Sequence, residues 1–212
     1  MKVTVVLNGE PPSPNRLRHL AQGTAVYAAD GGAKACVAAS VCPERIVGDL
    51  DSLTGISVPA DWVCEEDTDQ NFTDFEKVLR RLPEAMSSLK ILGGLGERLD
   101  HTWNNLLLAA ALPETLPVCF AGERETLWRI TPACPCTQVL DAGATVSLLP
   151  AGPVHGVCTE GLFWNLDQAA LGPGLGLAQS NRCTGPLKVS VTSGILFLCW
   201  SHPGESSNLP PG

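Results

Sequence analysis

The chain has 212 residues, of which 44% are hydrophobic and 17% are charged, and its formal net charge at pH 7 is -8. A chain of this length can bury one large core or two smaller ones. The negative charge argues against a nucleic acid as the main partner, because no basic patch is present to displace counterions. No apolar run approaches the roughly 18 residues of a membrane helix, so we expect no membrane partner.

Nine cysteines are scattered through the chain, and the start, MKVTVVLNGE, is too polar for a secretory signal. An odd number of thiols without a signal peptide is typical of a reduced, cytoplasmic protein. Cys134 and Cys136 form the only close pair, and their spacing does not match a zinc site.

The first half alternates apolar β-branched runs with segments of helical period. Val3 to Leu7 is apolar apart from the Thr4 hydroxyl and β-branched apart from Leu7, as in a strand buried on both faces of a parallel sheet. We predict an α/β unit with a mostly parallel sheet. The expected strands cover 3–7, 25–29, 45–47, 60–64 and 89–92, and the expected helices cover 15–21, capped by Asn15, 33–39, a helix entered at Thr73, and 102–112.

The most informative motif follows the third strand, where Gly48 precedes Asp49, Asp51 and Ser52. On a turn opened by glycine, the two carboxylates can converge on one point. Such a pair is favourable when a cation lies between the acids or when both are well solvated. The motif therefore has two possible interpretations, a site for magnesium-bound phosphate and a polar surface turn.

Other predicted strands also end in polar or glycine-rich turns. Asp30, Gly31 and Gly32 follow the second strand, and Gly93, Gly94, Arg98 and Asp100 follow the fifth, while Thr73 and Asp74 open a helix. Each group has a purely structural explanation, as a tight turn or a helix cap. Their recurrence at one edge predicts a shared crevice, since ligands of open α/β sheets sit at the carboxyl ends of the strands.

The second half shows short β-rich segments separated by glycine and proline, which predicts an all-β sandwich. We expect the α/β unit to cover 1–131 and the sandwich 132–212, with a disordered tail from about residue 201. Trp164 could offer an aromatic face to a cationic ring or belong to the core. Ser193 and Gly194 are predicted to form a hairpin turn. The expected strands cover 125–131, 137–141, 145–149, 154–159, 163–166, 187–192 and 195–200.

Six motifs in order give the chain a family resemblance. The sequence is similar to thiamine pyrophosphokinases in ADGGAK (29–34), GDLDS (48–52), QNFTDFEKVL (70–79), GGLGERLDH (93–101), GLFWNL (161–166) and QSN (179–181). The resemblance implies transfer of pyrophosphate from ATP to the hydroxyl of thiamine, giving thiamine diphosphate and AMP. It also implies a homodimer whose thiamine site lies between the α/β domain of one subunit and the sandwich of the other.

The resemblance also assigns residues to roles. It implies Mg²⁺ on Asp49, Asp51 and Asp74, with Asp30 close by. It places Gln70, Arg98 and Asp100 around the substrates, and we expect Asp100 to orient the thiamine hydroxyl or take its proton. The same crevice would bind ATP and thiamine through Gly31, Gly32, Thr73, Gly93 and Gly94, with Trp164, Ser180 and Asn181 of the sandwich in the thiamine pocket.

Three positions depart from the family pattern. Asn71 stands where the family usually has aspartate, Glu97 replaces the last glycine of GGxGGR, and Lys34 replaces an asparagine. The changes at Asn71 and Glu97 keep open a non-catalytic nucleotide- or thiamine-binding protein. A pyrophosphokinase acting on a hydroxymethyl-pterin is a further alternative, because it would share the paired aspartates.

Overall fold

The computed structural model describes residues 1–202 of the chain, which form two compact units that meet in sequence between residues 123 and 124. The predicted domain boundary after residue 131 lies a little further along the chain and stays a proposal. The predicted disordered tail lies almost wholly outside the described residues. Among residues 1–202, no helix is long and apolar enough to cross a membrane.

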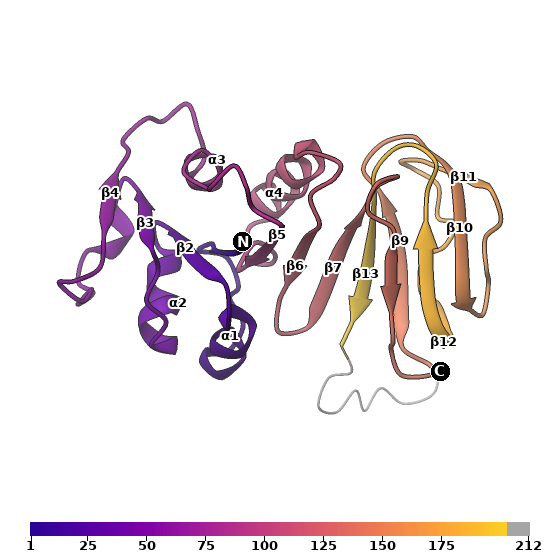
Figure 1. Cartoon of the computed structure of the whole chain (residues 1–212), viewed down its shortest axis with the longest axis horizontal. Coiled ribbons are helices and arrows are strands. Elements are labelled where there is room, and N and C mark those ends of the chain that lie inside the picture. The colour runs from indigo at the N-terminus through magenta and orange to yellow at the C-terminus, as the bar shows by residue number, and fades with distance from the viewer. Residues whose placement is uncertain (203–212) are drawn as a thin grey trace. The chain divides into compact units, whose positions relative to one another are not determined.

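The first unit is built on a parallel sheet with the strand order β6-β5-β1-β2-β3-β4. In this unit, α1 and α2 cover one face of the sheet and α3 and α4 the other (Figure 1). The strands are β1 (Lys2–Val6), β2 (Ala25–Ala29), β3 (Arg45–Gly48), β4 (Cys64–Glu66), β5 (Ser88–Leu92) and β6 (Val118–Ala121). The helices are α1 (Pro14–Ala21), α2 (Gly32–Ala39), the 3-10 turn η1 (Asp51–Leu53), α3 (Asp74–Leu79) and α4 (Leu99–Ala111).

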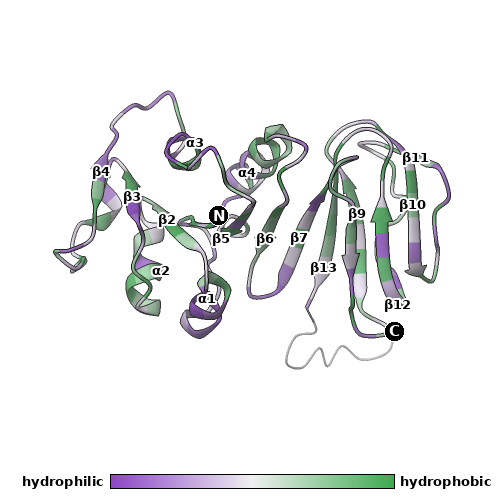
Figure 2. Cartoon of the chain, viewed as in Figure 1, coloured by the Kyte–Doolittle hydropathy of each residue, from purple (hydrophilic) through white to green (hydrophobic). Residues whose placement is uncertain are grey.

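The core of the first unit explains why these segments form strands and helices. Val6, Ala28 and Ile46 lie on adjacent strands and are fully buried, together with Leu17 of α1 and Cys36 of α2. Hydrophobic residues accordingly dominate β2 and α2 (Figure 2). Burying these side chains between the sheet and the two helices α1 and α2 stabilises this part of the unit.

The strand order reverses beside β1, and this reversal positions the site. The chain leaves β1 toward β2 on one side, whereas it leaves β5 toward β6 on the other. The onward connections therefore run to opposite sides of the sheet, and in open α/β sheets such a reversal places a ligand crevice at the carboxyl edge.

The second unit consists of antiparallel strands, as predicted. Its strands are β7 (Glu125–Ile130), β8 (Cys136–Gln138), β9 (Thr145–Pro150), β10 (Val154–Leu162), β11 (Ala169–Leu171), β12 (Asn181–Ser190) and β13 (Leu196–Ser201). The pairing order is β11-β10-β12-β9-β13-β7, and β8 pairs with β12. One buried cluster that includes Leu148, Leu187 and Leu198 fills its core.

Several predicted boundaries in the first unit are wrong. The strand expected over 60–64 lies at β4, and β6 was missed. Helix α1 begins at Pro14 after Ser13, not at a cap on Asn15, because proline suits the first helical position. Helix α4 begins at Leu99, three residues earlier than expected.

In the second unit, no strand covers 163–166, and β11 lies beyond that segment. Ser193 and Gly194 do not form a hairpin, because β12 and β13 are not paired with each other. Ser193 forms a bridge with His155, and Gly194 packs against the Pro153 carbonyl oxygen, 2.3 Å from where a Cβ would lie.

Candidate functional site

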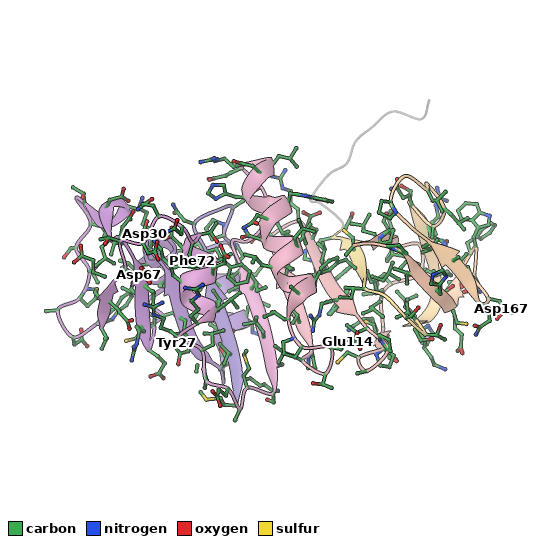
Figure 3. The ribbon with its side chains drawn as sticks, turned by 90° about the horizontal axis from the view of Figure 1, so that it is seen from above. Tyr27, Asp30, Asp67, Phe72, Glu114 and Asp167 are labelled. Carbon is green, nitrogen blue, oxygen red and sulfur yellow. The ribbon has the colours of Figure 1, made fainter. Side chains whose placement is uncertain are left out.

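An acidic cavity of about 660 Å³ lies at the carboxyl edge of the parallel sheet. Its walls come from the segments that follow β1, β2, β3 and β5 and from the starts of α3 and α4. Figure 3 shows two of the lining residues, Asp30 and Phe72, which come from different loops of the first unit. The predicted crevice is therefore present.

Asp30 is the most deeply buried acid of this cavity. It directly follows β2, is 3% exposed and has a left-handed backbone with φ of 39°. Gly48 makes room for it, because a Cβ at that position would lie 2.6 Å from the Asp30 Cβ. The buried Oδ1 atom of Asp30 has no hydrogen-bond partner among residues 1–202. A buried carboxylate oxygen without a donor is costly, which points to a ligand that would complete it.

Asp49 and Asp51 converge on Asp30, as the turn after β3 predicts. Carboxylate oxygens of the three residues lie within 4.8 Å of one another. Leu50 between the two acids is left-handed, with φ of 61°, and this turns both side chains toward the same point. We call Asp30, Asp49 and Asp51 the carboxylate cluster.

The pKa of Asp49 reflects its surroundings. Partial burial raises the pKa of this carboxyl, but hydrogen bonds from the Asp51 backbone amide (3.4 Å) and the Gln70 side-chain amide (3.4 Å) outweigh it. The pKa of Asp49 therefore lies below its usual value. Asp49 is a carboxylate at neutral pH, which is the state that a cation requires.

Asp74, the third predicted metal ligand, lines the same cavity but is not a member of the carboxylate cluster. It opens α3 after Thr73, whose hydroxyl caps the helix in a capping box with Glu76. The Lys77 ammonium, buried beneath it, lies 3.4 Å from Asp74 Oδ1. Burial raises the pKa of Asp74, and the nearby charges of Asp30 and Asp49 raise it further against the effect of Lys77.

Arg98 and Asp100 form a bidentate pair at the start of α4. Arg98 Nε donates to Asp100 Oδ1 at 3.2 Å, and Arg98 Nη2 donates to Asp100 Oδ2 at 2.6 Å. These bonds from Arg98 hold the pKa of Asp100 below its ordinary value. Two of the five guanidinium N–H groups are used in this pair, which leaves the others available to phosphate oxygens.

The predicted glycines have different environments. Gly93 and Gly94 line the acidic cavity, and a Cβ on Gly93 would lie 2.3 Å from the Leu7 carbonyl oxygen. Gly31 lies instead in a second, adjacent cavity. Gly32 begins α2 against β1, where a Cβ would lie 2.1 Å from the Val6 carbonyl oxygen, so packing explains it.

Sequence analysis did not assign several residues of the acidic cavity to the site. Asn105, on α4, is buried and donates from Nδ2 to the Gly94 carbonyl oxygen at 3.0 Å, which fixes the glycine loop. Asn8 lies two residues after the end of β1, and this position close to a strand end could have identified it. The other unassigned lining residues include Ser52, Phe72, Lys77, Glu97 and Asn104.

In the second unit, Trp164 is 60% exposed and packs edge-to-face on Phe163 with ring centroids 4.8 Å apart. Asn181 is buried and holds the Trp164 backbone, since its Nδ2 donates to the Trp164 oxygen at 2.8 Å and its Oδ1 accepts from the Trp164 amide at 3.2 Å. Ser180 is exposed beside it. Trp164 is thus a surface aromatic, and Asn181 acts on it through the backbone.

The fold and the acidic cavity define a class: a two-unit protein that joins a parallel α/β unit, with carboxylates at a strand-order reversal, to an all-β unit. The catalytic-domain model of thiamin pyrophosphokinase matches residues 17–120. The vitamin B1 binding-domain model of thiamin pyrophosphokinase matches residues 136–196. Together these models cover most of the chain, which therefore belongs to the thiamin pyrophosphokinase family.

Solved structures with this fold come from both bacteria and fungi. The thiamine pyrophosphokinase of Bacillus subtilis is 20% identical, with a TM-score of 0.81 over 96% of this chain and 100% of that one. The enzyme of Geobacillus thermodenitrificans is 22% identical, with a TM-score of 0.79 over 97% and 99%. Yeast thiamin pyrophosphokinase is 18% identical, with a TM-score of 0.75 over 95% and 86%. These matches confirm the predicted fold.

Family membership also confirms the predicted activity. The chain is an enzyme, a thiamine diphosphokinase, and its second unit matches a domain that binds vitamin B1. This match favours thiamine over the hydroxymethyl-pterin that was also considered.

Proposed function

We propose that the enzyme takes its pyrophosphoryl group from ATP and that it binds the triphosphate with Mg²⁺ in the acidic cavity. The observation that carries this proposal is the carboxylate cluster, with its carboxylate oxygens within 4.8 Å of one another and an unpartnered, buried Oδ1 on Asp30. Three carboxylates this close repel one another, so the arrangement is favourable when a cation occupies it.

The residues fit magnesium by their chemistry. All donors of the cluster are oxygen atoms, which hard divalent ions prefer, and Mg²⁺ commonly shares phosphate oxygens with a few carboxylates. Asp30, Asp49 and Asp51 would hold the ion, and Asp74 stays a predicted further ligand. Bound Mg²⁺ would neutralise phosphate charge and polarise the phosphorus that is attacked.

The protein's own residues would position the substrates. Arg98 would donate its free N–H groups to phosphate oxygens, while Asp100, held as a carboxylate, would accept a hydrogen bond from the thiamine hydroxyl and orient it. The Gln70 side-chain amide donates a hydrogen bond to Asp49, and Thr73 caps the helix that begins at Asp74. Both residues would therefore lie on the side of the cavity where the metal binds.

The thiamine side of the proposal rests on the second unit. Trp164 would offer its exposed ring to the cationic thiazolium, beside Ser180, and Asn181 would hold the tryptophan loop in place. We propose that the enzyme is a cytoplasmic homodimer in which the sandwich of one subunit completes the α/β site of the other.

The test is release of AMP that depends on thiamine. Wild-type enzyme with ATP and Mg²⁺ is expected to release AMP only when thiamine is added, and EDTA is expected to stop the reaction. Asp49→Asn and Asp51→Asn should each lower kcat by at least about a hundredfold while the fold survives, because each removes one anionic ligand. Wild-type rates in both variants would contradict the metal assignment.

A further inference from the structure

A second cavity of about 520 Å³ adjoins the acidic cavity. The two share Leu7, Asn8, Gly9 and Glu97 in their walls, so they meet along the loop after β1. The walls of the second cavity are completed by Pro11, Gly31, Lys34 and Ala35. A ligand that fills the acidic cavity can therefore extend into this second cavity.

Glu97 lies where the two cavities meet, and its backbone conformation is unfavourable for a residue other than glycine. Its backbone is left-handed, with φ of 53°, a region that favours glycine. Its side chain is exposed, and within residues 1–202 it makes no hydrogen bond or ion pair. Because no side-chain contact offsets this backbone strain, we expect the Glu97 side chain to have a function.

Lys34 is the second charged residue of this cavity. It is exposed in the first turn of α2, where the helix dipole disfavours a cation and no acid accompanies it. Its side chain has no ion pair in the described part of the chain. By contrast, Lys77 and Arg98, the Lys and Arg residues that line the acidic cavity, are each bonded to a carboxylate.

We propose that the second cavity receives the nucleoside end of ATP, with the ribose hydroxyls donating to Glu97 and the base facing Lys34. The inference rests on the proposed function, which places the triphosphate at the carboxylate cluster. A carboxylate at the junction repels phosphate but accepts hydrogen bonds from a ribose diol. The base would lie against Leu7, Pro11 and Ala35, and the Lys34 ammonium, a donor only, would meet an acceptor nitrogen of its ring.

The backbone around Glu97 is held in place before any ligand binds. Hydrogen bonds join the segments after β1 and β5: Leu7 N to Leu92 O at 2.8 Å, Gly9 N to Gly93 O at 2.9 Å, and Glu10 N to Leu95 O at 3.1 Å. Such a preformed site loses little conformational entropy when the ribose is bound.

The experiment compares ATP with 2′,3′-dideoxyATP in steady-state assays of full-length wild-type, Glu97→Gly and Lys34→Met enzymes. Wild-type kcat/KM should be about tenfold lower for the dideoxy nucleotide, the effect of one charge-assisted hydrogen bond. Glu97→Gly should reduce this difference to about twofold by raising KM for ATP. Glycine adopts the backbone angle of residue 97 readily, so the variant should fold, and thermal unfolding checks this. Glu84→Ala, an exposed glutamate outside both cavities, is the matched control and should keep wild-type discrimination.

A second measurement asks whether the second cavity holds a nucleoside or a phosphate. Inorganic tripolyphosphate with Mg²⁺ has no nucleoside, so its inhibition constant should not rise in Glu97→Gly or Lys34→Met, while KM for ATP rises about fivefold in each. An equal rise of both constants in Lys34→Met would overturn the inference in favour of a phosphate subsite. Unchanged discrimination in Glu97→Gly would also overturn it. A wild-type enzyme without thiamine-dependent AMP release would refute the proposed function itself.

Discussion

Replacing Asp30 with asparagine should stabilise the metal-free enzyme while it removes activity. Each like-charged pair at 4.8 Å costs about 3 kcal/mol at an effective dielectric constant of about 20. Asp49 and Asp51 contact solvent, so screening reduces the combined relief to about 1–3 kcal/mol. Asparagine has nearly the same shape as aspartate and can donate to its neighbours, so the cavity should keep its form.

The assay is thermal unfolding of wild type and Asp30→Asn in EDTA and in Mg²⁺. In EDTA, the Tm of the variant should lie above that of wild type by about 2–4 °C for each kcal/mol by which the substitution raises the free energy of unfolding. In Mg²⁺ at a hundred times its dissociation constant, wild type should gain about 2.7 kcal/mol and the variant almost none, so the advantage of the variant over wild type should fall by about that amount. Asp61→Asn, an exposed acid outside the cavity, controls for the change in net charge.

A lower Tm for Asp30→Asn in EDTA would refute the repulsion argument. An undiminished gain in Mg²⁺ would remove Asp30 from the metal site. The two results are independent, so the electrostatic reasoning and the ligand assignment can fail separately.

Three further predictions concern other parts of the chain. Thr73→Ala should lower the free energy of unfolding by about 1 kcal/mol in urea titrations, because α3 loses its capping hydroxyl. Thr73→Ser keeps a capping hydroxyl and should retain most of the wild-type stability. Arg98→Gln should move the acidic limb of the kcat/KM profile to higher pH. Arg98 holds the pKa of Asp100 low, so without it the carboxylate is protonated sooner as the pH falls; an unmoved limb would exclude Asp100 from that step. Asn181→Ala should raise KM for thiamine several-fold and leave KM for ATP unchanged, because the Trp164 loop loses two hydrogen bonds; equal changes in both constants would indicate general damage.

The sequence predicted the cavity well wherever a local signal marks a strand end. Asp49 and Asp51 converge because Gly48 and the turn at Leu50 act over a few residues, and that turn is visible in the sequence. Strand ends and helix starts likewise marked Asp30, Asp74 and Asp100, which line the same cavity. The carboxylate cluster contains Asp30 in place of the predicted Asp74, because tertiary structure decides which acids approach within ligand distance.

The errors share a physical cause, which is that pairing partners lie far apart in the sequence. The turn at Gly194 has typical hairpin residues, yet β13 pairs with β7 and β9, and no local pattern encodes that choice. Strand β12 begins at Asn181, six residues before the predicted strand, because its early residues pair with β9. Helix α4 begins at Leu99, ahead of the expected Thr102, since Arg98 already has the extended backbone of a cap.

The backbone bonds between Leu7, Gly9 and Glu10 and the segment after β5 restrict how this enzyme can be re-engineered. Loop grafting or insertion there would break main-chain pairing, and a side chain on Gly93 would collide with the Leu7 carbonyl oxygen. Libraries that seek altered nucleotide use should therefore keep this framework fixed and vary the side chains that project from it. Asn8 and Glu97 line both cavities, so substitutions at these two positions would act directly on the ligand.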